Sequence, residues 1–186
     1  MNPVLTNLLS GLAGSAIGAA AAIWAGYAVG RQNKRLQEED RKKLAKSAML
    51  AIKAELTMLR DGYLAEMDEL LNSTGERQMI ESIYKVRQNY LTVYESNCAI
   101  LGLLPAEEMT AVVRAYTEVK VFIDVHRANS DLYDLYLTAR RPSDGIHYAN
   151  KLLAYSSVVR SSFQSAKIEV QRALETLVLS NVFESE

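Results

Sequence analysis

Cysteine, histidine, proline and glycine are scarce in this chain of 186 residues. Cys98 is the only cysteine, which excludes an internal disulfide and a cysteine-based zinc cluster and suits a reducing cytosol. We expect Cys98 to be a small core residue. There are only three prolines and nine glycines, and five of the glycines fall between Gly11 and Gly30. The remainder is therefore poor in turn residues, and the composition predicts an all-α fold.

Catalytic and metal-binding motifs are also lacking. The two histidines, His126 and His147, belong to no HExxH or ExxH pattern, and the sequence contains no CxxC. No GxxxxGK phosphate loop occurs, and no basic residue lies within four positions of Cys98. We therefore predict no catalytic residue, no metal site and no cofactor. The weaker alternative is a membrane-bound hydrolase or transferase whose scattered Tyr, Asp and His side chains converge in the fold.

Charge is missing from the first 30 residues. As a helix, residues 3–30 would be about 42 Å long, against about 30 Å for the hydrocarbon core of a bilayer. The stretch therefore predicts a transmembrane helix over residues 1–30, with a short N-terminal tail outside. A buried helix of a soluble protein and a cleaved signal peptide are the alternatives. A signal peptide would carry its basic residues before the apolar run, whereas none precedes it here.

Basic residues instead follow the apolar run. Residues 31–46 contain seven Lys or Arg against three acids, and residues 47–186 contain fourteen against nineteen. The positive-inside rule then places everything from Arg31 onward in the cytoplasm of a bacterial cell, beneath its inner membrane. Trp24 and Tyr27 are interfacial aromatics on the same side. The lipid bilayer is thus the first predicted partner, and the acidic remainder gives no indication of binding to duplex nucleic acid.

Small residues recur at every fourth position of the apolar stretch. Such a stripe resembles a glycine zipper, in which two helix backbones approach closely within lipid. It predicts self-association of the chain into a homo-oligomer. The alternative is that Ala and Gly are simply common in membrane helices. The predicted interface residues are Gly14, Gly18, Ala22, Gly26 and Gly30.

The cytoplasmic part is predicted to be an antiparallel bundle of about four helices. Residues 31–72 are predicted to form a juxtamembrane stalk and the first helix of the bundle. Residues 73–186 are predicted to form the remainder of the bundle. A capping-box pattern at Ser73 and Glu76 predicts that a second helix begins there. We expect that segment to break between Val86 and Tyr90 and to finish as a short helix near Leu101. Further helices are predicted over residues 105–139 and 146–182, separated by an exposed turn over residues 140–145.

The helix predicted over residues 105–139 has the clearest apolar seam, which becomes polar in its second half. His126 lies on this seam, where we expect a hydrogen-bonded core histidine that fixes the helix register. The seam comprises Val112, Tyr116, Val119, Ile123, His126, Ser130, Tyr133 and Leu137.

Two neighbouring segments carry a resemblance. YESNCAILGLLP and the following AVVRAYTEVKVFID resemble a pattern of uncharacterised bacterial single-span membrane proteins with a small cytoplasmic helical domain. The likeness covers roughly residues 90–124. It implies the same architecture for this chain and offers no catalytic residue to carry over.

Tyrosines outnumber phenylalanines ten to three. Most are expected to pack at the rim of the bundle. A minority hypothesis is a pocket for a small nucleotide signal, in which Tyr stacks on the base and Arg meets phosphate. The candidate residues for this pocket, or for contact with a protein partner, are Tyr94, Asn97, Arg114, His126, Arg127, Arg140 and Arg141.

Together these features predict a non-enzymatic, oligomerising, membrane-anchored sensor or effector whose cytoplasmic helices bind a signal or a partner. The architecture resembles membrane effectors of bacterial anti-phage defence, in which the membrane part changes permeability. The alternative is a passive scaffold that tethers a protein partner to the membrane.

Overall fold

The computed structural model describes the backbone of residues 3–76, 78–81 and 91–183, and the side chains of residues 24, 26–27, 29–76, 78–81 and 91–178. Regular structure throughout these residues is helical and includes no strand, which confirms the predicted all-α class. The chain divides into two compact units, Met1–Leu44 and Ala45–Glu186. The division falls inside the segment predicted as stalk and first bundle helix.

The first unit contains the N-terminal part of helix α1, which extends over Pro3–Leu59. The backbone of the predicted membrane segment is therefore helical from Pro3. Among the residues that the structure describes, no helix is both long enough and apolar enough to cross a bilayer. Most of the predicted segment, including the side chains of the interface positions 14, 18 and 22, lies outside the described side chains. Gly26 and Gly30 are described and exposed, with no neighbouring heavy atom within 4 Å of an added Cβ.

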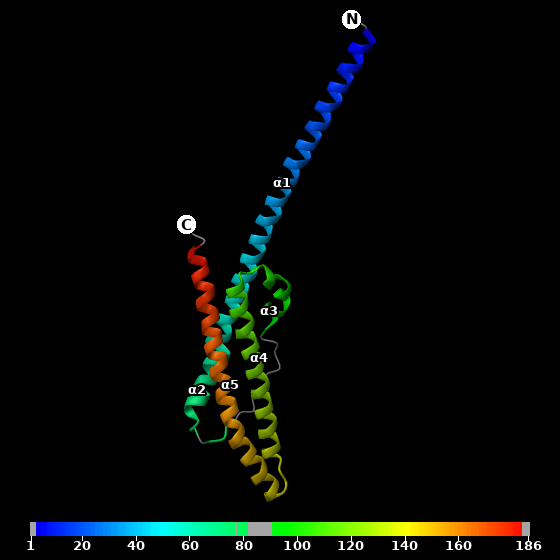
Figure 1. Cartoon of the computed structure of the whole chain (residues 1–186). Coiled ribbons are helices and arrows are strands. Elements are labelled where there is room, and N and C mark those ends of the chain that lie inside the picture. The colour runs from blue at the N-terminus through cyan, green and yellow to red at the C-terminus, as the bar shows by residue number, and fades with distance from the viewer. Residues whose placement is uncertain (1–2, 77, 82–90, 184–186) are drawn as a thin grey trace. The chain divides into compact units, whose positions relative to one another are not determined.

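The second unit begins within α1, which is followed without a break by the π-helix η1 (Arg60–Leu64) and by α2 (Ala65–Ser73). The short α3 (Thr92–Asn97) and the 3₁₀ helix η2 (Cys98–Leu103) precede two long helices, α4 (Ala106–Leu137) and α5 (Pro142–Phe183). Figure 1 shows these elements in chain order. The uninterrupted helix from Arg31 to the Asn72 region is as predicted, except for the π-helix within it.

The predicted second helix does not begin at Ser73. Ser73 is the last residue of α2, and its hydroxyl donates to the carbonyl of Leu70 (2.9 Å), so it does not cap a following helix. Residues 74–76 and 78–81 are not helical, because the backbone of Ile80 is bonded to other helices. The predicted break between residues 86 and 90 lies outside the described residues. The short helix expected near Leu101 is present as α3 and η2.

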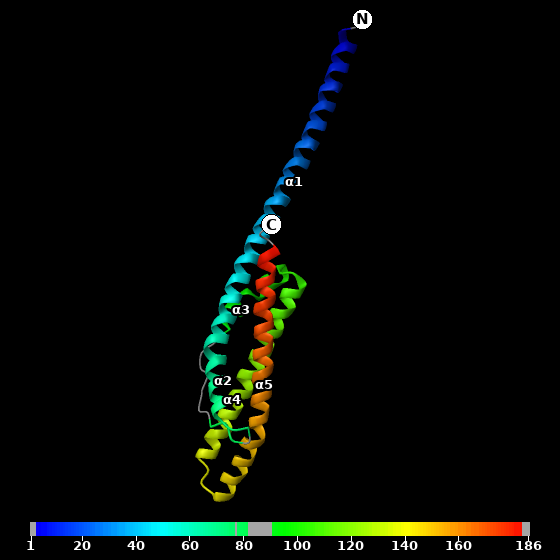
Figure 2. The same cartoon turned by 90° about the vertical axis from the view of Figure 1, so that its left-hand side faces the viewer.

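Helices α4 and α5 form an antiparallel hairpin around a turn at residues 138–141, and they lie side by side in both views (Figures 1 and 2). Alanines at their contact, Ala115 and Ala166 among them, are fully buried and allow close approach. The start of α5 was predicted four residues too late, because Pro142 occupies its first position, where the fixed φ of proline favours a helix.

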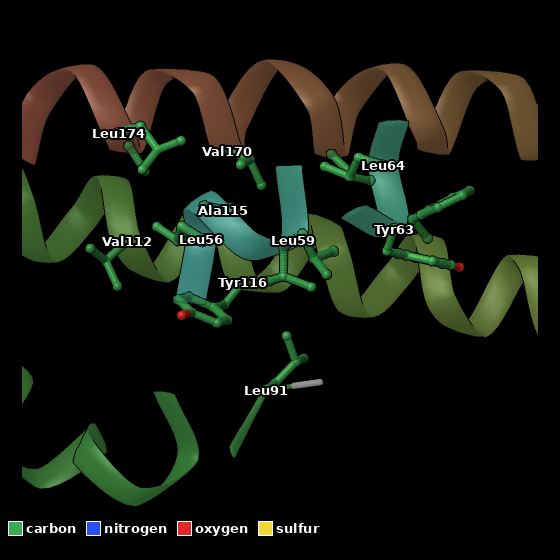
Figure 3. Close-up of a cluster of buried hydrophobic side chains, with 14 of the residues drawn as sticks. Leu56, Leu59, Tyr63, Leu64, Leu91, Val112, Ala115, Tyr116, Val170 and Leu174 are labelled. Atoms are coloured by element: carbon green, nitrogen blue, oxygen red, sulfur yellow. The ribbon is translucent and has the colours of Figure 1, made fainter. Parts of the chain in front are cut away.

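The run from Ala45 to Ser73 packs on this hairpin and, in both views, has the same chain direction as α4 (Figures 1 and 2). The antiparallel prediction therefore holds for α4 with α5 but not for the run from Ala45 to Ser73 with α4. Residues 74–76 and 78–81, where the returning helix was predicted, are not helical. The core lies between the run from Ala45 to Ser73 and helices α4 and α5. Figure 3 shows Leu56 and Leu59 of α1 together with Val112 and Ala115 of α4 and Val170 of α5.

The seam predicted for α4 is largely confirmed. Its members from Val112 to Ser130 are buried, including Tyr116 and His126 with no exposed surface. Tyr133 is only partly buried, and Leu137 is 53% exposed. The seam therefore faces the core for most of α4 and leaves it in the last two turns, where the sequence pattern also becomes polar.

Candidate functional site

A buried carboxylate on α1 holds the start of α3. Glu55 is only 8% exposed, and its two oxygens accept the backbone N–H groups of Val93 (2.8 Å) and Tyr94 (2.9 Å). These groups belong to the first turn of α3, whose N–H donors have no partner within their own helix. Tyr116 of α4 donates its hydroxyl to the same carboxylate (2.6 Å). Glu55 thus joins α1, α3 and α4 through charge-assisted hydrogen bonds.

Two tyrosines stack beside this carboxylate. The rings of Tyr94 and Tyr116 lie 3.9 Å apart between centroids and 15° from parallel. Burial, followed by the hydrogen bond to Glu55, raises the pKa of Tyr116 far above its ordinary value. Burial is also the main reason that the pKa of Tyr94 is raised. Both phenols therefore stay protonated at physiological pH, and Tyr116 acts as a hydrogen-bond donor to Glu55.

A second polar contact lies at the π-helix. Tyr63 of η1 is within hydrogen-bond distance of His126 Nδ1 (2.9 Å) in the core. The imidazole has no exposed surface and stacks on Phe122, with 5.9 Å between ring centroids. Burial lowers the pKa of His126 to about 4. The side chain is therefore neutral at pH 7 and is shielded from any substrate in solvent, as expected for a core histidine.

A third set of contacts fixes the chain after α2. Arg160 of α5 donates from Nη1 to the carbonyl of Leu71 (2.8 Å) and from Nη2 to those of Thr74 (2.7 Å) and Gly75 (3.0 Å). A cation at the carbonyl end of a helix also complements the helix dipole. The guanidinium therefore satisfies backbone carbonyls at and just beyond the C-terminal end of α2.

Ile80 is anchored between the two long helices. Asn129 of α4 donates to its carbonyl (2.9 Å), and its N–H donates to the hydroxyl of Ser156 on α5 (3.1 Å). The Ile80 side chain itself is fully buried. These side-chain bonds replace the helical bonds that this stretch would otherwise make.

Two cavities adjoin these contacts. The first, here called the α1–α3 cavity, measures about 580 Å³ and has mostly apolar walls. Its lining residues are Ala51, Ala54, Glu55, Met58, Leu59, Gly62, Tyr63, Glu66, Thr92 and Val93.

The second cavity, between the end of α2 and α5, measures about 770 Å³ and is more polar. Its lining residues are Leu70, Ser73, Thr74, Gln78, Met79, Glu81, Ala149, Asn150 and Leu153.

The side chains that line the α1–α3 cavity are suited to binding an apolar group. Glu55 lines it, but its carboxylate already accepts three hydrogen bonds, so it is poorly placed to take a proton from a ligand. Met58 is 75% exposed and offers a flexible apolar surface. Within the described part of the chain, no three His, Cys, Asp or Glu side chains are grouped closely enough to hold a metal ion. The mostly apolar walls of the cavity therefore suit an apolar side chain.

The residues predicted to form a ligand pocket are dispersed. Tyr94 and Asn97 share α3, where the Asn97 amide donates to the carbonyl of Val93 (2.7 Å). His126 is buried in the core beside Tyr63 instead of facing them. The predicted aromatic and amide members thus lie in two different environments.

The predicted arginines are spread along α4. Arg114 is exposed in the first third of the helix, and Arg127 is exposed with Nη1 3.4 Å from the Asp124 carboxylate. Arg140 and Arg141 are exposed beyond Leu137, about 35 Å along the helix axis from Arg114. One nucleotide cannot meet all four arginines.

Cys98 corrects another expectation. Its side chain is exposed, not buried, and its thiol donates to the carbonyl of Tyr94 (3.2 Å). It lies at the start of η2, directly after α3, a helix with no buried residue. Its exposure could not be predicted because α3 and η2, with six residues each, are too short to show a periodic pattern.

Sequence reasoning missed Glu55 and Arg160. Their partners are more than 35 residues away in sequence, at distances that no local pattern spans. The one available signal for Glu55 was its place one residue before Leu56, on the edge of the apolar stripe of α1.

No family model, curated protein or solved structure matches the chain.

Proposed function

We propose that this chain is a non-enzymatic, self-associating membrane protein whose helical unit Ala45–Glu186 binds a partner on the cytoplasmic side of a bacterial inner membrane. The observation that carries the proposal is the charge-free run of residues 1–30, helical from Pro3 onward, followed within residues 31–46 by seven basic residues, all exposed. Such an order is typical of a membrane anchor with its basic flank in the cytoplasm.

The small-residue stripe supports self-association. The stripe repeats every four residues from Gly14 to Gly30, and the two members that the structure describes, Gly26 and Gly30, have open space where a side chain would project. A second helix can therefore approach the backbone at these two glycines.

The interior of the bundle supports a binding role over a catalytic one. Glu55 and His126, two buried groups with acid-base chemistry, are engaged with Tyr116 and Tyr63. The α1–α3 cavity, in contrast, is open and mostly apolar, and exposed Met58 lines it. An apolar side chain of a protein partner is the occupant that fits these walls.

Two roles are consistent with this architecture. In the first, a signal received by the bundle alters the packing of the membrane helices and hence permeability, as in membrane effectors of anti-phage defence. In the second, the protein is a passive scaffold that holds its partner at the membrane. The α1–α3 cavity favours partner binding in both, so the two roles differ only in what the membrane helices do.

Crosslinking in membranes tests self-association. Replacing Gly18 and Gly26 together with Leu fills the stripe, and we expect the crosslinked oligomer to be largely lost. The matched control, Ala20→Leu with Ala28→Leu, places the same side chains about 200° around the helix and should leave the oligomer intact. Equal crosslinking in both double variants would contradict the proposal.

A permeability assay separates the effector from the scaffold. Cells induced to express the protein are followed for membrane potential and growth, with and without phage infection. Depolarisation that disappears in the Gly18→Leu, Gly26→Leu variant supports the effector. Unchanged potential and growth under both conditions would contradict the effector role and leave the scaffold.

A further inference from the structure

One face of the first unit carries a row of aromatic and basic side chains. We call it the aromatic–basic face and define it by Trp24, Tyr27, Arg31, Arg35 and Lys42. All five residues are exposed, Trp24 by 77% and Tyr27 by 62%.

These residues share a face because of their spacing. An α-helix turns about 100° per residue, so Trp24, Arg31, Arg35 and Lys42 lie within about 40° of one another around α1, and Tyr27 lies next to them. The row is also held together locally, since the Arg31 guanidinium carbon lies 5.0 Å from the centre of the Tyr27 ring. A cation placed over an aromatic ring at this distance is attracted to its face.

The opposite face of the same unit has a different character. Gly26 and Asp40 lie about 160° from the middle of the row, and exposed Leu36 lies about 120° from it. The acids Glu38 and Glu39 lie about 40° and about 60° from the middle of the row. Four of the seven cations of residues 31–46 lie within about 40° of it, and the other three lie about 80–100° away, so this side of the helix keeps a positive excess.

We infer that the aromatic–basic face docks on anionic phospholipid headgroups and enriches them around this helix, an inference that rests on the proposed membrane anchoring. Tryptophan and tyrosine favour the boundary between hydrocarbon and headgroups, and cations immediately beyond them meet the phosphate layer. That layer is about 5–7 Å deep, so it accommodates Arg31 and Arg35, which lie about 6 Å apart along the axis. Lys42, about 10 Å further on, acts across one Debye length of physiological salt.

Trp24 provides the probe, because it is the only tryptophan in the chain. The full-length protein is reconstituted into vesicles of phosphatidylcholine and phosphatidylglycerol in which either one lipid or the other is brominated in the upper acyl chain, at equal mole fractions. Quenching of Trp24 fluorescence reports which lipid lies beside this face. We expect brominated phosphatidylglycerol to associate about fivefold more strongly than brominated phosphatidylcholine, the size of effect that one well-placed cation has at an anionic surface.

Two variants test whether the face, and not the net charge, selects the lipid. The triple variant Arg31→Gln, Arg35→Gln, Lys42→Gln should reduce the preference to about one. A charge-restored variant adds Asn33→Lys, Gln37→Lys and Asp40→Asn to these three changes, which returns the net charge but places it on the opposite face. The preference reported by Trp24 should stay near one in this variant.

The outcomes are distinguishable. Raising the salt from about 0.1 M to about 1 M shortens the Debye length from about 10 Å to about 3 Å and should weaken the preference of the unmodified protein. Equal quenching by the two brominated lipids in the unmodified protein would overturn the inference while leaving the membrane anchor intact, and so would recovery of the preference in the charge-restored variant. Absence of quenching by both lipids, with the protein outside the vesicle fraction, would instead overturn the proposed anchoring.

Discussion

At the scale of single residues, two buried titratable side chains of the bundle core have specific hydrogen-bond partners. His126 meets Tyr63, and Glu55 meets Tyr116 and two backbone N–H groups of α3. A buried polar group without partners would cost about 1–3 kcal/mol, so these pairs fix the register between helices as well as satisfying hydrogen bonds. The register of the π-helix on α4 depends on the contact between Tyr63 and His126.

Protonation of His126 should destabilise the fold. Its pKa is about 4 in the folded protein, against about 6.5 in an unfolded chain, so between these values only the unfolded state binds the proton. The stability that the neutral imidazole contributes is complete above pH 6.5 and is lost as pH falls toward 4. The full loss is roughly 3 kcal/mol in the free energy of unfolding, measured by denaturant titration of the full chain in detergent micelles.

The histidine variants identify the source of this pH dependence. His126→Gln removes the titrating group, and its unfolding free energy should vary less between pH 6.5 and pH 4 than that of the unmodified protein. His147 is exposed, so His147→Gln should keep the full dependence. An unaltered pH dependence in the His126 variant would contradict the assignment.

The core position of His126 could be predicted from sequence, but its partner could not. The spacing of Val112, Tyr116, Val119 and Ile123 defines one face of a helix, and His126 continues that face. Tyr63 lies 63 residues earlier and reaches the imidazole from a π-helix. No periodic signal marks the extra residue of a π-helix, so this contact required the structure.

At the scale of elements, α3 is stabilised mainly by contacts with other helices. It has six residues, too few for a helix to persist alone in water, and two of its first N–H groups are satisfied by Glu55 of α1. Its Tyr94 ring also stacks on Tyr116 of α4. The position of α3 therefore depends on a carboxylate more than 35 residues earlier in the chain.

Glu55→Gln should loosen α3. Gln retains one acceptor oxygen and presents an NH₂ group where the second oxygen accepted hydrogen bonds, so the free energy of unfolding should fall by about 1–3 kcal/mol. Hydrogen exchange of the Val93 and Tyr94 amides should become faster. Glu66 lines the same cavity but is exposed, and Glu66→Gln should change neither quantity appreciably. Unchanged exchange at both amides in the Glu55 variant would show that the carboxylate does not hold α3.

The longer elements were more predictable than the connections between them. Helix α4 was predicted within two residues at each end because its periodic seam is long and because Pro105 precedes it. The stretch after Ser73 was predicted as helix because its local pattern matches a capping box, yet the bonds of Ile80 to Asn129 and Ser156 hold it in another conformation. Tertiary contacts outweigh a local capping signal here.

At the scale of the whole molecule, charged side chains are unevenly distributed along the chain. Residues 1–30 carry no charged side chain, and residues 31–46 carry seven basic and three acidic side chains. The remainder, residues 47–186, has more acidic than basic side chains. The bundle itself offers the α1–α3 cavity. The proposal of membrane anchoring with a cytoplasmic binding unit rests on this order of charge.

Labelling of Cys98 tests that claim most directly, because it is the only cysteine and is exposed on the bundle. Spheroplasts expressing the protein are treated with a membrane-impermeant maleimide before and after the inner membrane is permeabilised, and the carbonate-washed membrane fraction is then analysed. We expect the intact chain to stay in that fraction and Cys98 to be labelled only after permeabilisation, as membrane anchoring with a cytoplasmic bundle requires. Labelling of Cys98 in sealed spheroplasts, or an intact chain released by the carbonate wash, would contradict it.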